Sequence, residues 1–443
     1  MTPGTLFAAL KPLLGETLAR IEAQRCLECG GPTAAAPCLL ACPADVDVPA
    51  FVGAIARGDP MAAAAIIFAE NPLGGSCARV CPVEELCEGA CVLGAAARRP
   101  VEIARLQRFA TDQALSRGFP MGRPSPPNGK RVAVIGAGPA GLVCAGELAR
   151  LGYRVTVYDA RPDWGGLIRY AIAPYRQVRE PLPQEVERIA ALGVEFRMSC
   201  PVDSGERLSA IERDADAVFL GIGLGEDVAA AYPGDDLRGV WNSLPFIEAI
   251  KLGRPLWVGA RVVVIGGGNT AIDVAREGLR LGASEVTVLY RRTQAEMPAY
   301  SHELREARGE GVQFRWLTAP LRFLGNGRLD RVECQRMRLS EPDVSGRRRP
   351  EPVPASEFVI PADTAVLAVG QQRRTEFLGW IEGLRLEHGL IVIDRATGRT
   401  TNPKYFAGGD AVNGGDTVVA AVRAGKVAAR GIHRALSAAE RAA

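Results

Sequence analysis

The chain has 443 residues, of which 47% are apolar and 23% charged, and this length and balance predict roughly three globular domains. Its net charge of +3 excludes a strong electrostatic attraction to nucleic acid or to an anionic membrane. No apolar run approaches the ~20 residues of a membrane span, and the first four residues lack the features of a secretory signal. We therefore expect a cytoplasmic protein that binds neither nucleic acid nor a membrane.

The first 123 residues carry helical patterns and most of the cysteines. Apolar residues recur at helical spacing over 5–24, and shorter helices are expected at 49–57, 59–70 and 102–115. Eight of the 11 cysteines lie here, in the order Cys26, Cys29, Cys38, Cys42, Cys77, Cys81, Cys87 and Cys91. Clustered thiols in a reducing compartment indicate metal binding or catalysis rather than disulfides.

The cysteine spacing favours iron–sulfur clusters. Proline follows Cys42 and Cys81, as in the bacterial ferredoxins in which three cysteines of a run bind one cluster and the fourth binds another. The alternative is one or two structural zinc sites, which use paired C-x2-C knuckles. Only Cys26 and Cys29 have that spacing, so we expect an all-α iron–sulfur domain over residues 1–123.

After a linker rich in Pro and Gly at 122–129, the sequence changes to alternating strands and helices. A strand over 131–135 leads into a G-x-G-x-x-G turn that precedes a helix, and the turn consists of Gly136, Gly138, Pro139, Ala140 and Gly141 around Ala137. Its glycines permit the tight turn, the approach of a pyrophosphate and close helix–strand packing. Asp159 ends the next strand, where a carboxylate binds ribose hydroxyls. These features predict a dinucleotide-binding fold.

A second unit of the same kind begins with a strand over 261–265. Its turn is the G-x-G-x-x-A variant, formed by Gly266, Gly267, Gly268, Asn269, Thr270 and Ala271. The following strand ends in Arg291 and Arg292 without an acid, and guanidinium groups bind a 2′-phosphate that a carboxylate would repel. The alternative is a pair of solvated arginines. We expect a nicotinamide cofactor here, with a preference for the phosphorylated form.

Near the C-terminus, the segment 405–410 is followed by Thr417 and a helix rich in Gly and Ala. The segment resembles the second flavin motif of flavoproteins with two dinucleotide-binding domains, in which an Asp at the position of Asp410 binds the ribityl chain. An N-cap role for Asp410 is the alternative. The layout predicts an α/β protein with an NAD(P)H domain (230–368) inserted in an FAD domain (124–229 and 369–443). Cys144, Cys200 and Cys334 offer no redox pair, so electrons must leave by another route.

The order of cysteine domain, flavin turn and nicotinamide turn is similar to the small subunit of glutamate synthase and its relatives. These include the N-terminal half of dihydropyrimidine dehydrogenase, the separate bacterial flavin subunit of that enzyme, and ferredoxin–NADP transhydrogenases. The segments 71–82 and 86–91 are highly specific to this family. The resemblance implies two 4Fe-4S clusters with one ligand that is not a cysteine.

The resemblance also assigns residues. Cys26, Cys29, Cys38 and Cys91 would hold one cluster; Cys42, Cys81, Cys87 and Gln107 would hold the other, and Cys77 would be left over. The further FAD contacts implied are Gly166, Leu167, Arg176, Val202, Gly409, Asp410 and Thr417, and those implied for NAD(P)H are Ala368, Val369 and Gly370. Glutamine rather than glutamate at position 107 resembles the dihydropyrimidine dehydrogenase branch.

By resemblance, the chain is an electron-input subunit: NAD(P)H reduces FAD, and single electrons leave through two clusters. The cofactors carry the chemistry, so no catalytic acid or nucleophile is expected. A substrate-reducing barrel of ~250 residues does not fit in the remaining chain. We therefore expect a separate partner subunit that contains FMN and iron–sulfur clusters and reduces pyrimidines. The alternatives are glutamate synthase, a transhydrogenase-type partner, and a non-catalytic zinc scaffold. Relatives with a similar arginine pair include NADH users, so the coenzyme choice stays open.

Overall fold

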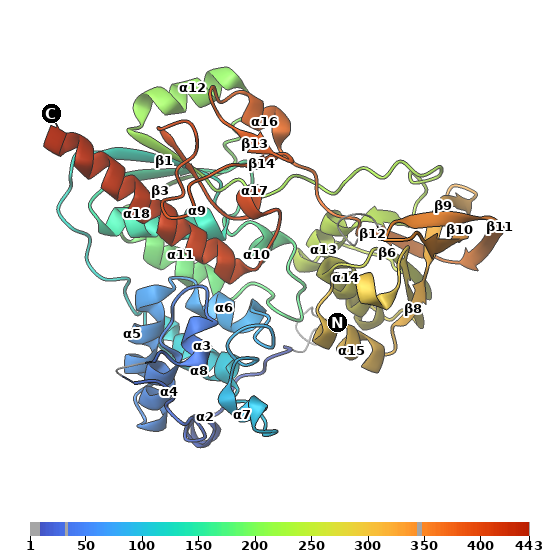
Figure 1. Cartoon of the computed structure of the whole chain (residues 1–443), viewed down its shortest axis with the longest axis horizontal. Helices are drawn as coiled ribbons and strands as arrows, with labels where there is room; N and C mark the ends of the chain where they lie inside the picture. Colours follow the sequence, from blue (N-terminus) through green and yellow to red (C-terminus); the bar gives the residue numbers. More distant parts are fainter. Residues whose placement is uncertain (1–8, 32–33, 343–347, 443) are drawn as a thin grey trace. The chain divides into compact units, whose positions relative to one another are not determined.

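The computed structural model describes residues 9–31, 34–342 and 348–442 (Figure 1). It divides into two compact units. The larger unit contains residues 9–172, 176–225 and 373–443, and the smaller unit contains residues 173–175 and 226–372. The chain therefore leaves the larger unit after residue 225 and returns to it at residue 373, as an inserted domain does. The expected domain boundaries at 123, 229 and 368 stay predictions.

The first part of the larger unit is helical. Its helices are α2 (Glu16–Ala23), α3 (Pro37–Leu40), α4 (Val48–Ala56), α5 (Pro60–Glu70), α6 (Gly74–Val80), α7 (Val92–Ala95) and α8 (Ile103–Ser116). Asp47 and Asp59 cap α4 and α5: the side chain of each accepts a backbone N–H, and a proline stands in the first turn. The expected helices at 49–57, 59–70 and 102–115 are thus present within one or two residues.

The expectation of one amphipathic helix over 5–24 is wrong for the described residues 9–15, and residues 1–8 lie outside the description. The helix begins only at Glu16, after an extended Gly15. Pro12 lacks the amide hydrogen and the backbone freedom that a helix interior needs. The buried face of α2 consists of Ala19, Glu22 and Ala23, whereas Leu18 is 60% exposed.

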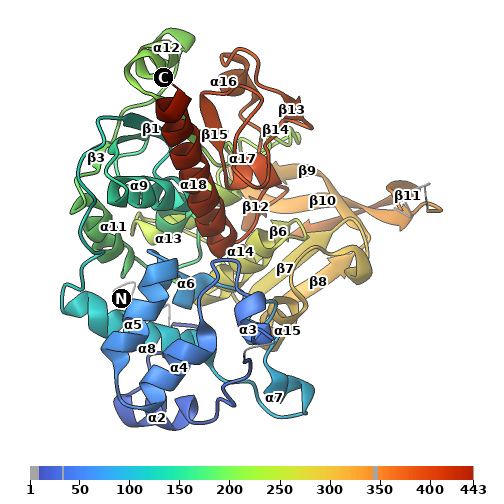
Figure 2. The same cartoon turned by 60° about the vertical axis from the view of Figure 1, so that its left-hand side comes forward.

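A five-stranded parallel sheet forms the rest of the larger unit, in the order β15-β4-β1-β2-β3. The strands are β1 (Arg131–Ile135), β2 (Arg154–Tyr158), β3 (Glu195–Arg197), β4 (Ala217–Leu220) and β15 (Tyr405–Ala407). One face packs against α9 (Pro139–Arg150) and α18 (Val418–Ala442), and it shares one continuous core with the cysteine-bearing helices. The other face packs against α12 (Gly205–Asp214) and α16 (Thr375–Gly379). Figure 2 shows α18 crossing α9 in front of the sheet.

Shorter elements complete this unit. They are α10 (Leu167–Tyr170), α11 (Leu182–Ala190), α17 (Asp410–Asn413), β13 (Leu386–Glu387) and β14 (Leu390–Ile391). The C-terminal strand β15 pairs with β4, almost two hundred residues earlier in the chain. The sheet is therefore complete only when both ends of the chain are in place.

The smaller unit also has a five-stranded sheet with all strands parallel, in the order β5-β12-β6-β7-β8. Its edge strand β5 comes first in the unit, whereas the edge strand β15 of the larger unit comes last. Its elements are β5 (Val240–Asn242), α13 (Ser243–Lys251), β6 (Arg261–Ile265), α14 (Asn269–Arg280), β7 (Glu285–Tyr290), η1 (Gln294–Glu296), α15 (Ser301–Gly309), β8 (Gln313–Trp316) and β12 (Thr364–Leu367). An antiparallel sheet of β9 (Thr318–Gly325), β10 (Leu329–Leu339) and β11 (Pro350–Pro361) is added, which the sequence did not lead us to expect. The predicted α/β class, with two Rossmann-like folds that follow an all-α region in the sequence, is confirmed.

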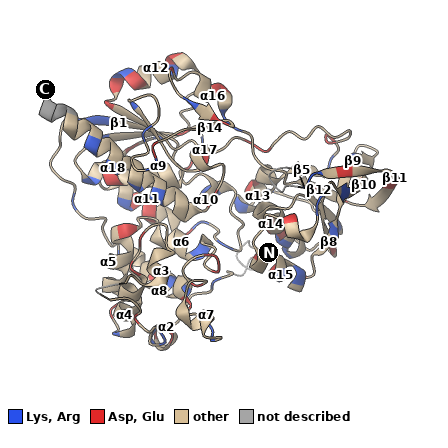
Figure 3. Cartoon of the chain, in the orientation of Figure 1, with Lys and Arg blue, Asp and Glu red and all other residues tan. Residues whose placement is uncertain are grey.

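Charge and hydropathy agree with the composition. Basic and acidic residues are interspersed along the helices in the view of Figure 3. Within the described ranges, no helix is both long enough and apolar enough to cross a membrane.

Candidate functional site

The first candidate site is a cavity in the helical region. It is lined by the four cysteines expected to hold one cluster, namely Cys26, Cys29, Cys38 and Cys91. Burial and the neighbouring thiols raise the pKa of Cys38 to about 11, and burial also raises the pKa of Cys26. Cationic iron would stabilise the thiolates that this cavity otherwise disfavours. Leu27, which is 63% exposed, lines the same cavity, so the cavity lies at the molecular surface.

The second candidate site is a separate cavity. It is lined by Cys42, Cys81, Cys87 and Gln107, the complete set expected for the other cluster. Burial raises the pKa of Cys42 and of Cys87, and each also experiences the charge of Cys81. Among the residues that the structure describes, no three His, Cys, Asp or Glu side chains converge as the ligands of a single metal ion would. The thiols instead surround two cavities, which fits polynuclear clusters.

Gln107 is oriented by a hydrogen bond. Its Nε2 donates to the carbonyl oxygen of Gly74 at 2.7 Å, which leaves Oε1 as the atom available to a metal. Cys77 also lines this cavity, and a hydrogen bond between the Cys77 and Cys81 side chains is the first cause of the raised pKa of Cys81. The structure thus brings both Gln107 and Cys77 to the cavity, and the choice between them stays a prediction.

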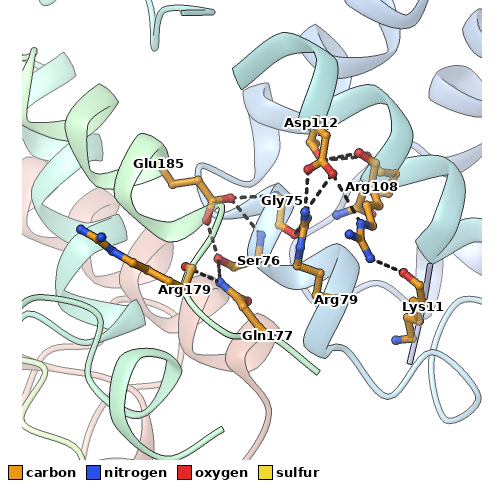
Figure 4. A network of polar contacts seen from close by, with 11 residues as sticks. Lys11, Gly75, Ser76, Arg79, Arg108, Asp112, Gln177, Arg179 and Glu185 are labelled. Carbon is orange, nitrogen blue, oxygen red and sulfur yellow. Dashed lines mark hydrogen bonds and ion pairs between the residues drawn. The ribbon is translucent and has the colours of Figure 1, made fainter. Parts of the chain in front are cut away.

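The helix α6 carries Gly74 and Cys77, and Cys81 follows directly after its last residue; buried polar groups fix it on both sides (Figure 4). Glu185, fully buried on α11, accepts hydrogen bonds from the amides of Gly75 and Ser76 at 2.7 and 3.1 Å, and from the Ser76 hydroxyl. Arg79 forms a bidentate pair with Asp112 of α8 at 2.9 and 2.8 Å. These contacts join the cysteine-bearing helices to each other and to the sheet-bearing part of the larger unit.

The first glycine turn has the shape that a bound pyrophosphate needs. Gly136 has φ +104°, and a Cβ there would overlap the Gly221 carbonyl. A Cβ on Gly138 would meet no atom closer than 4.0 Å, which leaves open space before the N-terminus of α9. A Cβ on Gly141 would overlap the Gly136 carbonyl oxygen. A side chain would thus not fit at Gly136 or Gly141, and the space at Gly138 is open, so the turn fits a dinucleotide; that these glycines bind one stays a prediction.

Other predicted flavin residues gather around this turn. A Cβ on Gly166 would lie 2.9 Å from the Cα of Gly138, and a Cβ on Gly409 would lie 3.2 Å from the Cβ of Ala140. Asp159 accepts hydrogen bonds from the amides of Ala137 and Arg161 at 2.7 and 2.8 Å. Each of its oxygens keeps a second lone pair for a ribose hydroxyl.

The C-terminal motif lies between the flavin turn and the second cavity. Asp410 begins α17, and burial raises the pKa of its carboxyl group. The Thr417 hydroxyl accepts from the amide of Ala420 at 3.2 Å and so caps α18. Val419, two residues further on, lines the second cavity. The remaining predicted flavin contacts lie in the same unit: Leu167 is 37% exposed, Arg176 is half-buried, and Val202 packs against the core of the second sheet face.

The second glycine turn, in the smaller unit, is built in the same way. A Cβ on Gly266 would overlap the carbonyl oxygen of Ala368, and one on Gly268 would meet nothing within 4 Å. Asn269 accepts from the amide of Tyr300 at 2.9 Å, and Thr270 follows it in the first turn of α14. Val369 is 40% exposed, and Gly370 has φ +112° with open space around it.

The arginine pair after β7 is divided between surface and interior. Arg291 is exposed. Arg292 is half-buried, and its Nε is buried without a hydrogen-bond partner among the described atoms. A buried donor of this kind favours an anionic ligand, because leaving it unpaired costs free energy. The 2′-phosphate of NADPH fits this position.

Several residues that shape the site carried no sequence signal. Glu185 accepts hydrogen bonds from amides that lie 109 and 110 positions earlier in the chain. The Lys11 ammonium group donates to the carbonyl oxygen of Cys81, 70 positions later. No motif contains either residue. Such long-range polar contacts follow from packing alone.

Comparisons with known proteins agree with this geometry. A family described as pyridine nucleotide-disulphide oxidoreductase matches residues 130–425, and one described as dihydropyrimidine dehydrogenase domain II, 4Fe-4S cluster, matches residues 5–119. The putative oxidoreductase AegA of Escherichia coli is 39% identical over 94% of this chain and 65% of its own length. The beta subunit of the NADP(+)-dependent formate dehydrogenase of Moorella thermoacetica is 41% identical over 91% of this chain and 60% of its own. The chain thus spans less than two-thirds of these two relatives.

A third relative has nearly the same length. The small chain of the NADPH glutamate synthase of Escherichia coli is 36% identical over 96% of this chain and 93% of its own. Among solved structures, FprA of Mycobacterium tuberculosis in complex with NADPH is similar in fold, with a TM-score of 0.58 and 22% identity over 71% of this chain and 86% of that one. The chain therefore belongs to the pyridine nucleotide-disulphide oxidoreductase family and, within it, to the iron–sulfur flavoproteins related to the glutamate synthase small chain.

Proposed function

We propose that the chain is the electron-input subunit of a larger cytoplasmic complex: it oxidises NAD(P)H with FAD and passes single electrons through two 4Fe-4S clusters to a partner subunit. The observation that carries this proposal is the presence of two separate cavities, each lined by one complete set of expected ligands. A zinc scaffold would not need a glycine turn open to a pyrophosphate.

The residues of the chain have distinct tasks in this proposal. The turn at Gly138 and the N-terminus of α9 would hold the FAD pyrophosphate, and the turn at Gly268 with Arg292 would hold NADPH. Bound FAD exchanges electron pairs with nicotinamide, and bound clusters carry electrons singly. The protein supplies orientation, exclusion of water and a fixed electrostatic field.

The two cavities differ in position. Val419 lines the second cavity and is two residues from Thr417 of the flavin motif, whereas the exposed Leu27 lines the first. We therefore assign the second cavity to the cluster next to the flavin and the first cavity to the cluster that faces the partner.

The partner that we propose is a pyrimidine-reducing subunit of dihydropyrimidine dehydrogenase. Gln107 supports this choice through the resemblance of its setting to that branch. The second candidate is a partner of the glutamate synthase or formate dehydrogenase kind, which the relatives favour by name. Mixing the reduced chain with each candidate subunit, and assaying uracil or glutamine turnover, distinguishes the two.

Metal and flavin analysis of anaerobically purified protein tests the core of the proposal. We expect about eight irons, about eight sulfides and one FAD per chain. One or two zinc ions without sulfide would refute it. A matched pair of variants tests the ligand choice: Gln107→Ala should alter the spectrum of one cluster, while Cys77→Ser should leave both spectra unchanged. The reverse result would make Cys77 the ligand.

A further inference from the structure

A short segment before α2 lies against the helix that carries Gln107. The Nε of Arg105 donates to the carbonyl oxygen of Pro12 at 2.9 Å, and the Arg108 guanidinium donates to the carbonyl oxygen of Lys11. Figure 4 shows Arg108 between Lys11 and Asp112. The Nε of Arg108 also donates to a carboxylate oxygen of Asp112 at 3.4 Å. Two arginines of α8 therefore hold this segment by its backbone.

The result is a defined position for the ammonium group of Lys11. Its Nζ donates to the carbonyl oxygen of Cys81 at 2.5 Å, so the charge lies beside the backbone of a residue that lines the second cavity. The Lys11 charge also acts to lower the pKa of the Cys81 and Cys87 thiols. The hydrogen bond with Cys77 and burial outweigh this effect at Cys81, and burial outweighs it at Cys87. Glu88 is an acidic neighbour of the Cys87 thiol, and its carboxylate accepts a hydrogen bond from the amide of Ala104 at 2.9 Å.

We propose that Lys11 raises the reduction potential of the cluster bound at the second cavity. Reduction adds one electron to the cluster, and no bond forms or breaks while Lys11 keeps its proton. A fixed positive charge beside the backbone of a cluster ligand stabilises the more negative, reduced state. A neutral Gln107 ligand acts in the same direction, so both residues favour reduction of the cluster at the second cavity. This inference rests on the proposed function, since it takes the second cavity to be a cluster site.

Redox titration followed by electron paramagnetic resonance on the full-length holoprotein tests the inference. Lys11→Gln and Lys11→Met should each lower the equilibrium constant for reduction of one cluster about tenfold, which is about 59 mV for a one-electron couple. Lys11→Arg should keep the wild-type potential because it keeps the charge. Lys404→Gln is the matched control, because it removes a lysine charge at the start of β15 without touching a cysteine cavity.

Each outcome has a defined meaning. Unchanged potentials in both uncharged variants, with both clusters present, would overturn the inference. Loss of about four irons from both uncharged variants would also overturn it, because Lys11 would then be needed for assembly rather than for tuning. Absence of a second cluster from the wild-type protein would refute the proposed function instead.

Discussion

Replacing Glu185 by Gln should change how the stability of the protein depends on pH. Burial raises the pKa of this carboxyl group from its ordinary 4.5 to about 7, against the opposing effect of its hydrogen bonds from Ser76 and Gly75. Between these two pH values the folded protein holds a proton on Glu185 that the unfolded chain has released. Stability therefore falls as the pH rises through this window, by on the order of 3 kcal/mol for a difference of this size.

Glu185→Gln removes this titration while keeping the shape and one acceptor oxygen. At pH 5 the variant should be no more stable than the wild type, and at pH 8 it should gain several degrees in Tm relative to the wild type. Midpoints should be compared at one heating rate, because unfolding with loss of clusters is irreversible. Glu187→Gln, on the exposed face of the same helix, is the matched control and should show no such trend. A Tm difference between Glu185→Gln and wild type that stays constant from pH 5 to pH 8 would refute the reasoning.

Two further predictions concern the nucleotide sites. Gly425→Ala places a Cβ against the Ala140 carbonyl oxygen, where α18 crosses α9, so the variant should lose about 1–3 kcal/mol of stability. It should also lose part of its FAD, measured by the fluorescence of flavin released on denaturation, whereas Gly309→Ala, with open space around it, should lose neither. Unaltered FAD content in Gly425→Ala would contradict this packing. Changing Arg291 and Arg292 together to Ala should raise KM for NADPH roughly ten- to a hundredfold and KM for NADH much less, because one charge-assisted contact contributes about 1.5–3 kcal/mol. Equal effects on both coenzymes in steady-state assays would show that these arginines do not bind the 2′-phosphate.

The sequence was sufficient for the two dinucleotide-binding folds. Strands such as 131–135 and 261–265 are short apolar runs that end in glycine turns, and both strands begin and end where expected. The cysteine sets could be assigned because their spacing is specific to a family, and the structure gathers each set at its own cavity. Local pattern and family resemblance agree at these positions.

Other features could not be read from the sequence. The apolar spacing over 5–24 looks helical, but Pro12 and Gly15 prevent a helix over residues 9–15. This segment lies against α8 instead. The antiparallel strands β9 to β11 have much of their length exposed, with Val359 49% exposed, so no clean alternation marks them. Glu185 meets its partners about 110 residues away, and only tertiary packing determines such contacts.

The pairing of β15 with β4 has a consequence for biosynthesis. A ribosome makes the N-terminal part of a protein first. The parallel sheet of the larger unit therefore lacks its edge strand β15 until residues 405–407 have been made. The inserted unit, residues 226–372, emerges entirely within that interval and has its own complete sheet. Closing the larger unit then brings together strands separated by a long intervening segment, at a modest entropic cost once that segment has folded. We expect a chain that ends at residue 372 and has been released from the ribosome to protect the inserted unit from protease while failing to retain FAD.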